Sequence, residues 1–445
     1  MAAKLVEIVC RLGSAPGRKR LLLGAFFHAW PIFFPIAHAY RRTIIRRPRI
    51  IAVVGSFGKT TTTRAVSAAL GLPRDPYRGW NSGGFLAAGL LRIRPGARHA
   101  VLEVGISRKG TMARYARLLR PDIAVVTSIG SEHHESLGTL EGTREEKSAM
   151  VRALASAGLA VLNGDDPNVL WMREATNARV ITFGLGGACD VRASSVSIDI
   201  REGTRFELHA DGRTRDVVVR LLGRHMVYPV LAAIAVSLGE GLSLDEVLPR
   251  LERLAPTPER LQVVRTGDGA FLIVDTAKSM LETLLVSLNT LGELRADRKI
   301  VVVGDIEEPK GSQGPLYKAL GTRLADIATR VVFVGGGKAF ESLASGTRGA
   351  GMPKESVVYA GRSARRAAEL VQEDLRAGDV VLIKGRSTQH LERVAFRLVG
   401  RPVPCDVEAC GLKPGCGECP LIVRAARKAR AKARGGSGRL PAAGG

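Results

Sequence analysis

Short apolar runs that end in Gly, Ser or Asp recur along the chain from Arg49 onward, and helical patterns separate them. The first series is rich in β-branched residues and consists of RIIAVVG, HAVLEVG, DIAVVTSIG and LAVLNGDD. This alternation predicts a parallel sheet with crossover helices. Residues 190–220 instead alternate apolar and polar positions, which predicts an antiparallel appendage.

A helical stretch from about 226 to 253 follows, and Pro256 and Pro258 punctuate the chain after it. A second series of strand-like runs comes next: AFLIVD, KIVVVGD, RVVFVGGG, SVVYAG and DVVLIKG. The predicted fold class is α/β, with a second, Rossmann-like C-terminal sheet whose ligands should gather at the carboxyl ends of its strands. The expected segments are a leader (1–48), a central domain (49–255), a C-terminal domain (256–400), a cysteine motif (401–420) and a disordered basic tail (421–445).

The leader contains a run of twenty uncharged residues, Leu21 to Tyr40, flanked on both sides by arginines. Its length suits a bilayer span, but Pro31 and Pro35 interrupt it. A re-entrant or interfacial helix pair and a helix buried on the catalytic body are the alternatives. No small-residue cleavage site precedes the next basic block, which argues against a signal peptide.

The formal net charge is +24, and most of it lies at the two ends of the chain. Basic ends beside an apolar segment indicate an anionic membrane surface. Nucleic acid would also account for the charge, but no recognition module is visible, so no nucleic acid is expected. These features favour a cytoplasmic protein at the inner face of the cell membrane.

The segment GSFGKTTT follows a predicted strand and precedes a predicted helix, which is the context of a phosphate-binding loop. Gly55 and Gly58 let backbone N–H groups approach phosphate oxygens, helped by the helix N-terminus. Lys59 would reach the terminal phosphates and Thr60 would bind Mg²⁺. Val53 stands where the longer phosphate-loop pattern has glycine, so this is the shorter GxxGKT form.

This shorter loop resembles the ATP loop of the Mur ligases, the amino-acid-adding enzymes of peptidoglycan synthesis. Further segments resemble that family in the order in which it uses them: LEVGISRKG, PDIAVVTSIGSEHHESLGTLEGTREEKSAM, AVLNGDDP, GRHMVYPVLAAIAV, PTPERLQV and LIVDTAKS. VVVGDIEE and VLIKGRS match the carboxyl domain of the MurF-like branch. The resemblance spans roughly residues 49–400.

The resemblance implies ATP and Mg²⁺ as cofactors, with catalytic roles for Lys59, His133 and Lys147. The implied ATP-binding residues are Gly55, Ser56, Phe57, Gly58, Lys59, Thr60, Thr61, Arg260 and Asp275. Magnesium would be held by Thr60, Glu103, His133 and a carbamylated Lys147. A bare lysine would repel a metal ion, whereas capture of CO₂ converts it to an anion that attracts one.

The chain departs from the family pattern at several positions. Met226 and Pro229 stand where two asparagines of the adenine helix are usual, and Ser128 replaces an expected asparagine. The usual paired acids before Asp275 are reduced to Val274-Asp275, and Lys278 replaces a His or Asn. Only 54 residues precede Gly55, so no room is expected for the domain that grips a UDP-sugar, and substrate recognition should differ.

Four of the six cysteines fall within CDVEACGLKPGCGEC, with the spacing C-x4-C-x5-C-x2-C. Thiolates from two short loops suit a tetrahedral, structural Zn²⁺ held by Cys405, Cys410, Cys416 and Cys419. An iron–sulfur cluster, unliganded thiols and two disulfides are the alternatives. The scarcity of cysteine elsewhere indicates a reducing compartment.

The sequence therefore predicts an ATP-dependent carboxylate–amine ligase that works through an acyl phosphate. Its carboxylate substrate should be an anionic peptide, polyamide or cell-envelope precursor. The alternative is a membrane-anchored nucleotide-binding scaffold without ligase activity, which Met226, Pro229 and Val274 favour and the retained Lys147 opposes. Amine-dependent release of ADP would separate the two.

Overall fold

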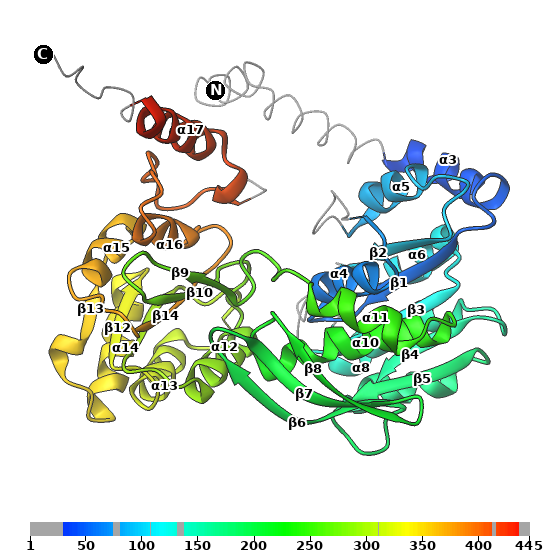
Figure 1. Cartoon of the computed structure of the whole chain (residues 1–445), viewed down its shortest axis with the longest axis horizontal. Coiled ribbons are helices and arrows are strands. Elements are labelled where there is room, and N and C mark those ends of the chain that lie inside the picture. Colours follow the sequence, from blue (N-terminus) through cyan, green and yellow to red (C-terminus); the bar gives the residue numbers. More distant parts are fainter. Residues whose placement is uncertain are drawn as a thin grey trace, which may run out of the picture. The chain divides into compact units, whose positions relative to one another are not determined.

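The computed structural model describes residues 30–73, 81–106, 108–130, 138–309, 311–411 and 415–435. The chain divides into two compact units, one ending at Ala255 and the other running from Pro256 onward (Figure 1). The short segments 198–203 and 221–223 belong to the second unit.

The first unit is built on an eight-stranded sheet whose central strands are parallel and buried. In spatial order the strands are β2 (His99–Glu103), β1 (Arg49–Val54), β3 (Ile123–Val126), β4 (Leu159–Asn163), β5 (Arg179–Gly184), β6 (Val191–Asp199), β7 (Gly203–Ala210) and β8 (Arg213–Val219). β1 pairs in parallel with both β2 and β3, so three strands end together at one carboxyl edge. Their near-continuous apolar sequences reflect burial on both faces.

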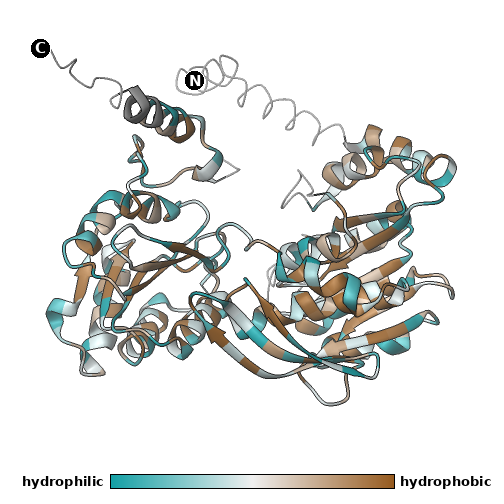
Figure 2. Ribbon diagram, viewed as in Figure 1, coloured by the Kyte–Doolittle hydropathy of each residue, from teal (hydrophilic) through white to brown (hydrophobic). Residues whose placement is uncertain are grey.

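Helices cover both faces of this sheet. Contacts with the strands and with one another place α4 (Lys59–Ala69), α10 (Val227–Gly239) and α11 (Leu244–Glu252) on one face. The other helices among the described residues of this unit are α3 (Trp30–Thr43), α5 (Gly83–Leu91), α6 (Thr111–Leu119), α8 (Leu140–Arg152), α9 (Pro167–Leu170) and the 3₁₀ helices η1 (Trp171–Ala175) and η2 (Arg224–Met226). α3, α5 and α6 contact one another and share a buried apolar core with the strands. Figure 2 shows the central strands of this sheet mostly in the brown of hydrophobic residues.

The predicted appendage is an extension of the same sheet. β7 and β8 pair antiparallel, as the alternating sequence predicts, whereas β6 joins β5 in parallel. The predicted helical stretch over 226–253 is two helices, because Gly241 takes a φ of 78° and Ser243 caps a new helix. Ser243 and Glu246 form a reciprocal capping box, a signal that the sequence already contained.

The second unit contains the predicted second α/β sheet, which has six strands. Their order is β13 (Val357–Tyr359), β12 (Arg330–Val334), β11 (Lys299–Gly304), β14 (Val380–Lys384), β10 (Phe271–Asp275) and β9 (Gln262–Arg265). All neighbours are parallel except β9, which pairs antiparallel with β10 at the edge. Its helices are α12 (Leu281–Glu293), α13 (Gln313–Ala325), α14 (Gly337–Gly349), η3 (Lys354–Ser356), α15 (Ala364–Gln372), α16 (Glu392–Leu398), η4 (Cys416–Glu418) and α17 (Pro420–Gly435).

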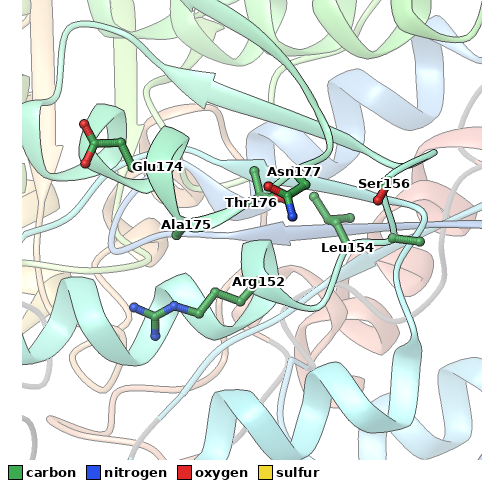
Figure 3. A pocket seen from close by; sticks show the side chains of 8 residues that line it. Arg152, Leu154, Ser156, Glu174, Ala175, Thr176 and Asn177 are labelled. Atoms are coloured by element: carbon green, nitrogen blue, oxygen red, sulfur yellow. The ribbon is translucent and has the colours of Figure 1, made fainter.

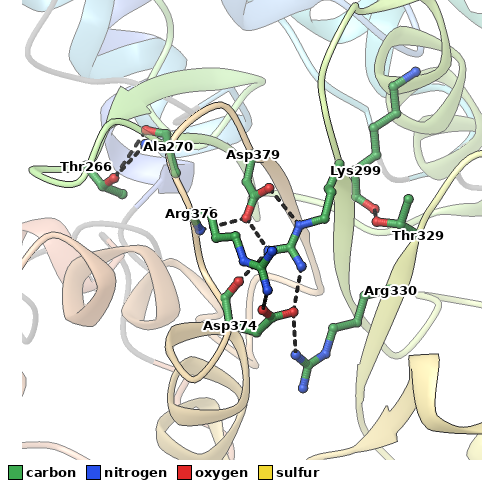
Figure 4. Close-up of polar contacts among 9 residues, drawn as sticks. Thr266, Ala270, Lys299, Thr329, Arg330, Asp374, Arg376 and Asp379 are labelled. Carbon is green, nitrogen blue, oxygen red and sulfur yellow. Dashed lines mark hydrogen bonds and ion pairs between the residues drawn. The ribbon is translucent and has the colours of Figure 1, made fainter.

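An arginine-centred network fixes the amino edge of this second sheet (Figure 4). Arg298 donates to Asp379 at 2.7 and 2.9 Å and to a carboxylate oxygen of Asp374 at 2.6 Å, and it also binds the Asp374 carbonyl. The side chain of Asp379 is 1% exposed, so its buried negative charge has to be compensated by Arg298. The network joins the beginnings of β11 and β14, at the edge opposite the carboxyl ends of these strands.

The described part of the predicted leader, residues 30–48, packs against the rest of the first unit. Ala37 in α3 is fully buried, and Tyr40 donates from its hydroxyl to the carbonyl of Ile93 at 2.8 Å. Arg41 is 7% exposed and donates to four backbone carbonyls and to Asp122. Within the described ranges, no helix combines the length and apolar character that a bilayer crossing requires.

Candidate active site

The phosphate loop leaves β1 at the carboxyl edge of the first sheet and leads directly into α4. Gly55 has a φ of 147°, and a Cβ there would overlap the hydroxyl of Thr127. Gly58 has a φ of 82° and stands at the N-cap of α4. The two glycines are therefore required by backbone geometry, as the GxxGKT pattern predicts.

Side chains at the end of β3 hold this loop in shape. The Ser56 N–H donates to the Ser128 carbonyl at 2.8 Å, and the Phe57 N–H donates to Ser128 Oγ at 2.9 Å. Thr127 Oγ1 donates to the Phe57 carbonyl at 2.6 Å. Ser128, a departure from the family sequence, thus supports the phosphate loop directly.

Lys59 begins α4 and folds back over the loop. Its Nζ donates to the carbonyls of Gly55 and Ser56, each at 2.8 Å. Thr60 is half-buried beside it, whereas Thr61 faces the interior at 5% exposure. The ammonium group and the start of α4 therefore meet at one place, which suits the terminal phosphates of a nucleotide.

Lys147 reaches the same loop from α8. It is 2% exposed, and its Nζ donates to Ser56 Oγ at 2.8 Å. Ser56 Oγ also accepts from the Gly130 N–H at 2.7 Å. The structure thus brings together Lys147 and the phosphate loop, although 91 residues separate Lys147 from Ser56.

Glu103 ends β2 beside Val53, at the same carboxyl edge. Its Oε1 accepts from Asn81 Nδ2 at 2.8 Å, and the Asn81 carbonyl accepts from the Gly105 N–H at 2.7 Å. Asn81 was not identified from the sequence, where its one signal is the NSGG run before α5. His133 lies outside the described residues. The Glu103 carboxylate and the Thr60 hydroxyl supply the hard oxygen atoms that Mg²⁺ prefers.

The segment AVLNGDDP binds backbone groups around this edge. Asn163 Nδ2 donates to the Thr127 carbonyl at 2.8 Å, and Asp166 accepts from the Ile129 N–H at 2.7 Å. Asp165 accepts from Tyr228 Oη at 2.9 Å, at the start of α10. Burial, followed by the hydrogen bond to this carboxylate, raises the pKa of Tyr228. The motif therefore positions the loops that surround the phosphate site.

Met226 and Pro229, the departures in the helix expected to lie under adenine, are both buried. They contribute packing area to α10 where the family pattern supplies amides. Tyr228 between them is the residue that makes a polar contact, through Asp165.

Asp275 ends β10 in the second unit and is 6% exposed. Its Oδ2 accepts from Lys384 Nζ and from Ser287 Oγ, both at 2.6 Å. Burial alone would raise the pKa of Asp275, but Lys384 and the Ser287 hydroxyl hold it below its usual range. Burial lowers the pKa of Lys384.

Arg260 sits in a turn with unusual backbone angles. The residues on either side of it, Glu259 and Leu261, have φ values of 61° and 43°. Such a conformation is strained for a non-glycine residue, and strain of this kind is concentrated at functional sites. Burial and the nearby Glu392 carboxylate raise the pKa of Glu259 to about 7.

The four clustered cysteines do not form one set of metal ligands. Among the described residues, the group with ligand atoms close enough for a metal ion consists of His390, Glu392 and Cys416. Cys405 instead accepts from Arg393 Nη1 at 3.8 Å. The predicted four-thiolate site is therefore not supported, because the regular spacing of the cysteines does not determine where the chain places their sulfur atoms.

A polar pocket of about 350 Å³ lies at the opposite, amino edge of the first sheet (Figure 3). Residues of the connection between α8 and β4, including Leu154 and Ser156, line it together with Asn177 before β5. None of the predicted site residues lines this pocket, so it lies apart from the phosphate loop.

Comparison with known proteins agrees with this geometry. The Mur ligase middle domain matches residues 53–237, and the Mur ligase glutamate ligase domain matches residues 259–387. The chain is 31% identical over 372 residues to the UDP-N-acetylmuramoyl-tripeptide–D-alanyl-D-alanine ligase of Mycobacterium bovis, covering 79% of this chain and 72% of that protein. The enzyme of the same name from Bacillus subtilis is 29% identical over 363 residues, which cover 80% of this chain and 77% of that one.

Solved structures show the same fold. A MurF structure from Acinetobacter baumannii superimposes with a TM-score of 0.73 at 24% identity, covering 82% of this chain and 79% of that one. MurF ligase from Thermotoga maritima in complex with ADP gives a TM-score of 0.70 at 22% identity, with coverages of 83% and 82%. The chain therefore belongs to the Mur ligase family, and it is an ATP-dependent amide-bond-forming ligase of that type.

Proposed function

We propose that this ligase joins a carboxylate of a cell-envelope or polyamide precursor to an amine through an acyl phosphate. The observation that carries the proposal is the contact between the buried Lys147 and the phosphate loop, with Nζ 2.8 Å from Ser56 Oγ. A packing role alone does not call for a lysine at 2% exposure, since burying an ammonium group is costly.

In the first half-reaction a carboxylate oxygen attacks the γ-phosphorus of ATP, and ADP leaves. In the second half-reaction the amine nitrogen attacks the acyl carbon, phosphate leaves and the amine loses a proton to solvent. Phosphoryl transfer depends mainly on positioning and charge neutralisation. We assign these tasks to Lys59, which would exchange the carbonyls of Gly55 and Ser56 for phosphate oxygens, and to the backbone N–H groups of the loop.

We further propose that Thr60 and Glu103 hold Mg²⁺, together with His133 and a carbamylated Lys147. When bound, the ions would neutralise the charge that develops on the transferred phosphoryl group. Arg260 and Asp275, which belong to the second unit, are the remaining residues for which we propose a role in nucleotide binding. The strained turn that presents Arg260 supports this role.

The relatives suggest the first substrates to test. Their names specify a UDP-N-acetylmuramoyl-tripeptide and D-alanyl-D-alanine, so these are the first carboxylate and amine to try. Anionic peptides and polyamides with a terminal carboxylate are the next candidates. The retained Lys147 and Glu103 oppose the alternative of a nucleotide-binding scaffold, since binding a nucleotide without ligase chemistry has no need of them.

The decisive measurement is ADP release that requires both a carboxylate and an amine. Lys59→Ala should reduce this rate by about 100-fold or more, the loss typical when a group that stabilises transition-state charge is removed. Lys338→Ala, an exposed lysine on α14, is the matched control and should keep the full rate. Unchanged turnover in a folded Lys59→Ala protein would refute the phosphate-loop assignment.

Carbamylation has a separate test. Lys147→Ala should inactivate the enzyme, and added short carboxylates should partly restore it, because they mimic the anionic oxygens of a carbamate. Protein equilibrated with ¹³C-labelled bicarbonate should give a carbamate carbon signal that Lys147→Ala lacks. Absence of that signal in active protein would argue for a bare lysine.

A further inference from the structure

A buried cluster of three potential metal ligands lies in the second unit, and the ligase chemistry does not use it. His390, Glu392 and Cys416 are all buried, and one ligand atom from each lies within 4.8 Å of the other two. His390 precedes α16, Glu392 begins that helix and Cys416 begins η4. The cluster thus joins the loop after β14 to a segment more than twenty residues further along the chain.

We propose that this cluster is a zinc site whose protein ligands are His390 Nδ1, the Glu392 carboxylate and Cys416 Sγ. A mixed nitrogen, oxygen and sulfur set is one that Zn²⁺ accepts readily, whereas Mg²⁺ and Ca²⁺ prefer oxygen ligands alone. This set differs from the four-thiolate site that the cysteine spacing suggests, since it shares Cys416 alone with it.

The surroundings of His390 match those of a metal-binding histidine. Its Nε2 lies 2.9 Å from the carbonyl oxygen of Cys410, which can only accept, so Nε2 carries the hydrogen. Nδ1 faces Glu392 Oε1 at 2.8 Å. Ligating histidines usually donate their other ring N–H to a carbonyl or carboxylate in this way. A zinc ion would replace the proton that Nδ1 shares with Glu392.

Glu392 gives independent support for a bound cation. It is 1% exposed, and its Oε1 also accepts from the Cys416 N–H at 2.9 Å. Its Oε2 is buried and accepts no hydrogen bond from any described group. A buried carboxylate oxygen without a partner is rare, because its desolvation is not repaid. A cation bound between Glu392, His390 and Cys416 would satisfy it.

A second buried acid borders the cluster. A Cβ on Gly415 would lie 2.5 Å from Glu259 Oε1 and 3.2 Å from Glu392 Oε1, so both carboxylates approach the same glycine. His390 and Glu259 hold φ values of 51° and 61°, which the packing around them must enforce. Glu259 would add attraction for a cation without being needed as a ligand.

Zinc binding would exchange protons for the ion without any redox change. The Cys416 thiol proton and the Nδ1 proton of His390 would leave to solvent as the Zn–S and Zn–N bonds form. The ion would tie η4 to the start of α16, next to Glu259 and therefore next to the turn that carries Arg260. The ion is thus expected to fix this turn, with water at the fourth position of the tetrahedron.

The test is zinc analysis of the full chain, purified under reducing conditions without chelators and then supplied with one equivalent of Zn²⁺. We expect one zinc per chain. Cys416→Ser and His390→Gln should each weaken zinc binding at least tenfold in a chelator competition. Cys405→Ser, Cys410→Ser and Cys189→Ser are the matched controls and should leave the affinity unchanged. Co²⁺ in place of zinc should show sulfur-to-metal charge transfer of a single thiolate, which Cys416→Ser removes.

Three results would overturn the proposal: no retained zinc in folded protein, equal loss of zinc in Cys405→Ser and Cys416→Ser, or a Co²⁺ spectrum with several thiolates. The last two would restore the four-thiolate site. Should Cys416→Ser fail to fold, His390→Gln and the Co²⁺ spectrum of the unmodified chain still decide the matter. None of these measurements depends on ligase turnover.

Discussion

The candidate sites of the two units are held together in different ways. In the first unit, the phosphate loop is fixed by hydrogen bonds between side chains and backbone, such as that from the Phe57 N–H to Ser128 Oγ. In the second unit, Asp275 and Lys384 form a buried ion pair, and His390 faces Glu392. Neutral hydrogen bonds to backbone are individually modest, whereas a buried charge is costly as soon as its partner is removed. Substitutions should therefore affect function more in the first unit and stability more in the second.

The largest loss of stability is expected from Lys384→Met. This change leaves the carboxylate of Asp275 buried without its cation, which typically costs about 3–5 kcal/mol. Urea unfolding of the second unit, followed by circular dichroism, measures the loss. The double variant with Asp275→Asn should recover most of it, because the uncompensated charge is then gone.

The control for this prediction is Arg323→Met. Arg323 forms an exposed pair with Asp326 at 3.7 Å, and its loss should change stability by no more than about 0.5 kcal/mol. Equal effects of Lys384→Met and Arg323→Met would remove the distinction between buried and surface charges in this unit.

Gly55→Ala tests whether the phosphate loop requires the backbone conformation of Gly55. The added Cβ would overlap Thr127 Oγ1, and the alanine would have to keep a φ of 147°. We therefore expect the free energy of unfolding to fall by about 2–4 kcal/mol and ATP turnover to be lost. Gly349→Ala on the exposed end of α14, where a Cβ meets no other group within 4 Å, should change stability by less than about 1 kcal/mol. An active Gly55→Ala protein would show that the loop can relax.

The same contrast explains what the sequence could predict. The phosphate loop is contiguous, and its glycines report backbone angles that only glycine adopts readily, so the pattern located it. The break between α10 and α11 carried a local capping signal as well. By contrast, Cys416 lies more than twenty residues after His390 and Glu392 in the chain, so no local pattern encodes their proximity. Asn81 was missed for the same reason, because its partner Glu103 lies 22 residues away.

Ser128→Ala removes one hydroxyl group that supports the phosphate loop. The Phe57 N–H would lose its acceptor, while the bond from the Ser56 N–H to the carbonyl of residue 128 remains. We expect the free energy of unfolding to fall by about 1 kcal/mol and the KM for ATP to rise several-fold. Ser342→Ala, whose hydroxyl bonds within α14, is the control for removal of a hydroxyl. An unchanged KM would mean that Thr127 Oγ1 and the carbonyl of residue 128 suffice to support the loop.

The smallest change in free energy is expected for a membrane contact of α3, whose inner face packs on the first unit. On its outer face, Ile32 is 65% exposed and Ile36, one helical turn later, is 51% exposed. Arg42 and Arg46, which follow in the chain, are also exposed. Apolar side chains beside arginines suit the interface of an anionic membrane, where each basic residue contributes about 1 kcal/mol. We propose that this face contacts such a membrane.

Co-sedimentation with vesicles that contain anionic lipid tests this contact. Arg42→Gln and Arg46→Gln should each weaken binding about fivefold, the equivalent of 1 kcal/mol, and added salt should have the same effect. Arg348→Gln on the exposed face of α14 is the charge-matched control. A truncation should begin at Trp30 and spare Arg41, because that side chain bonds to Asp122 and to the carbonyls of Leu119 and Arg120 inside the first unit. If both arginine variants bind as well as the control, α3 serves packing alone.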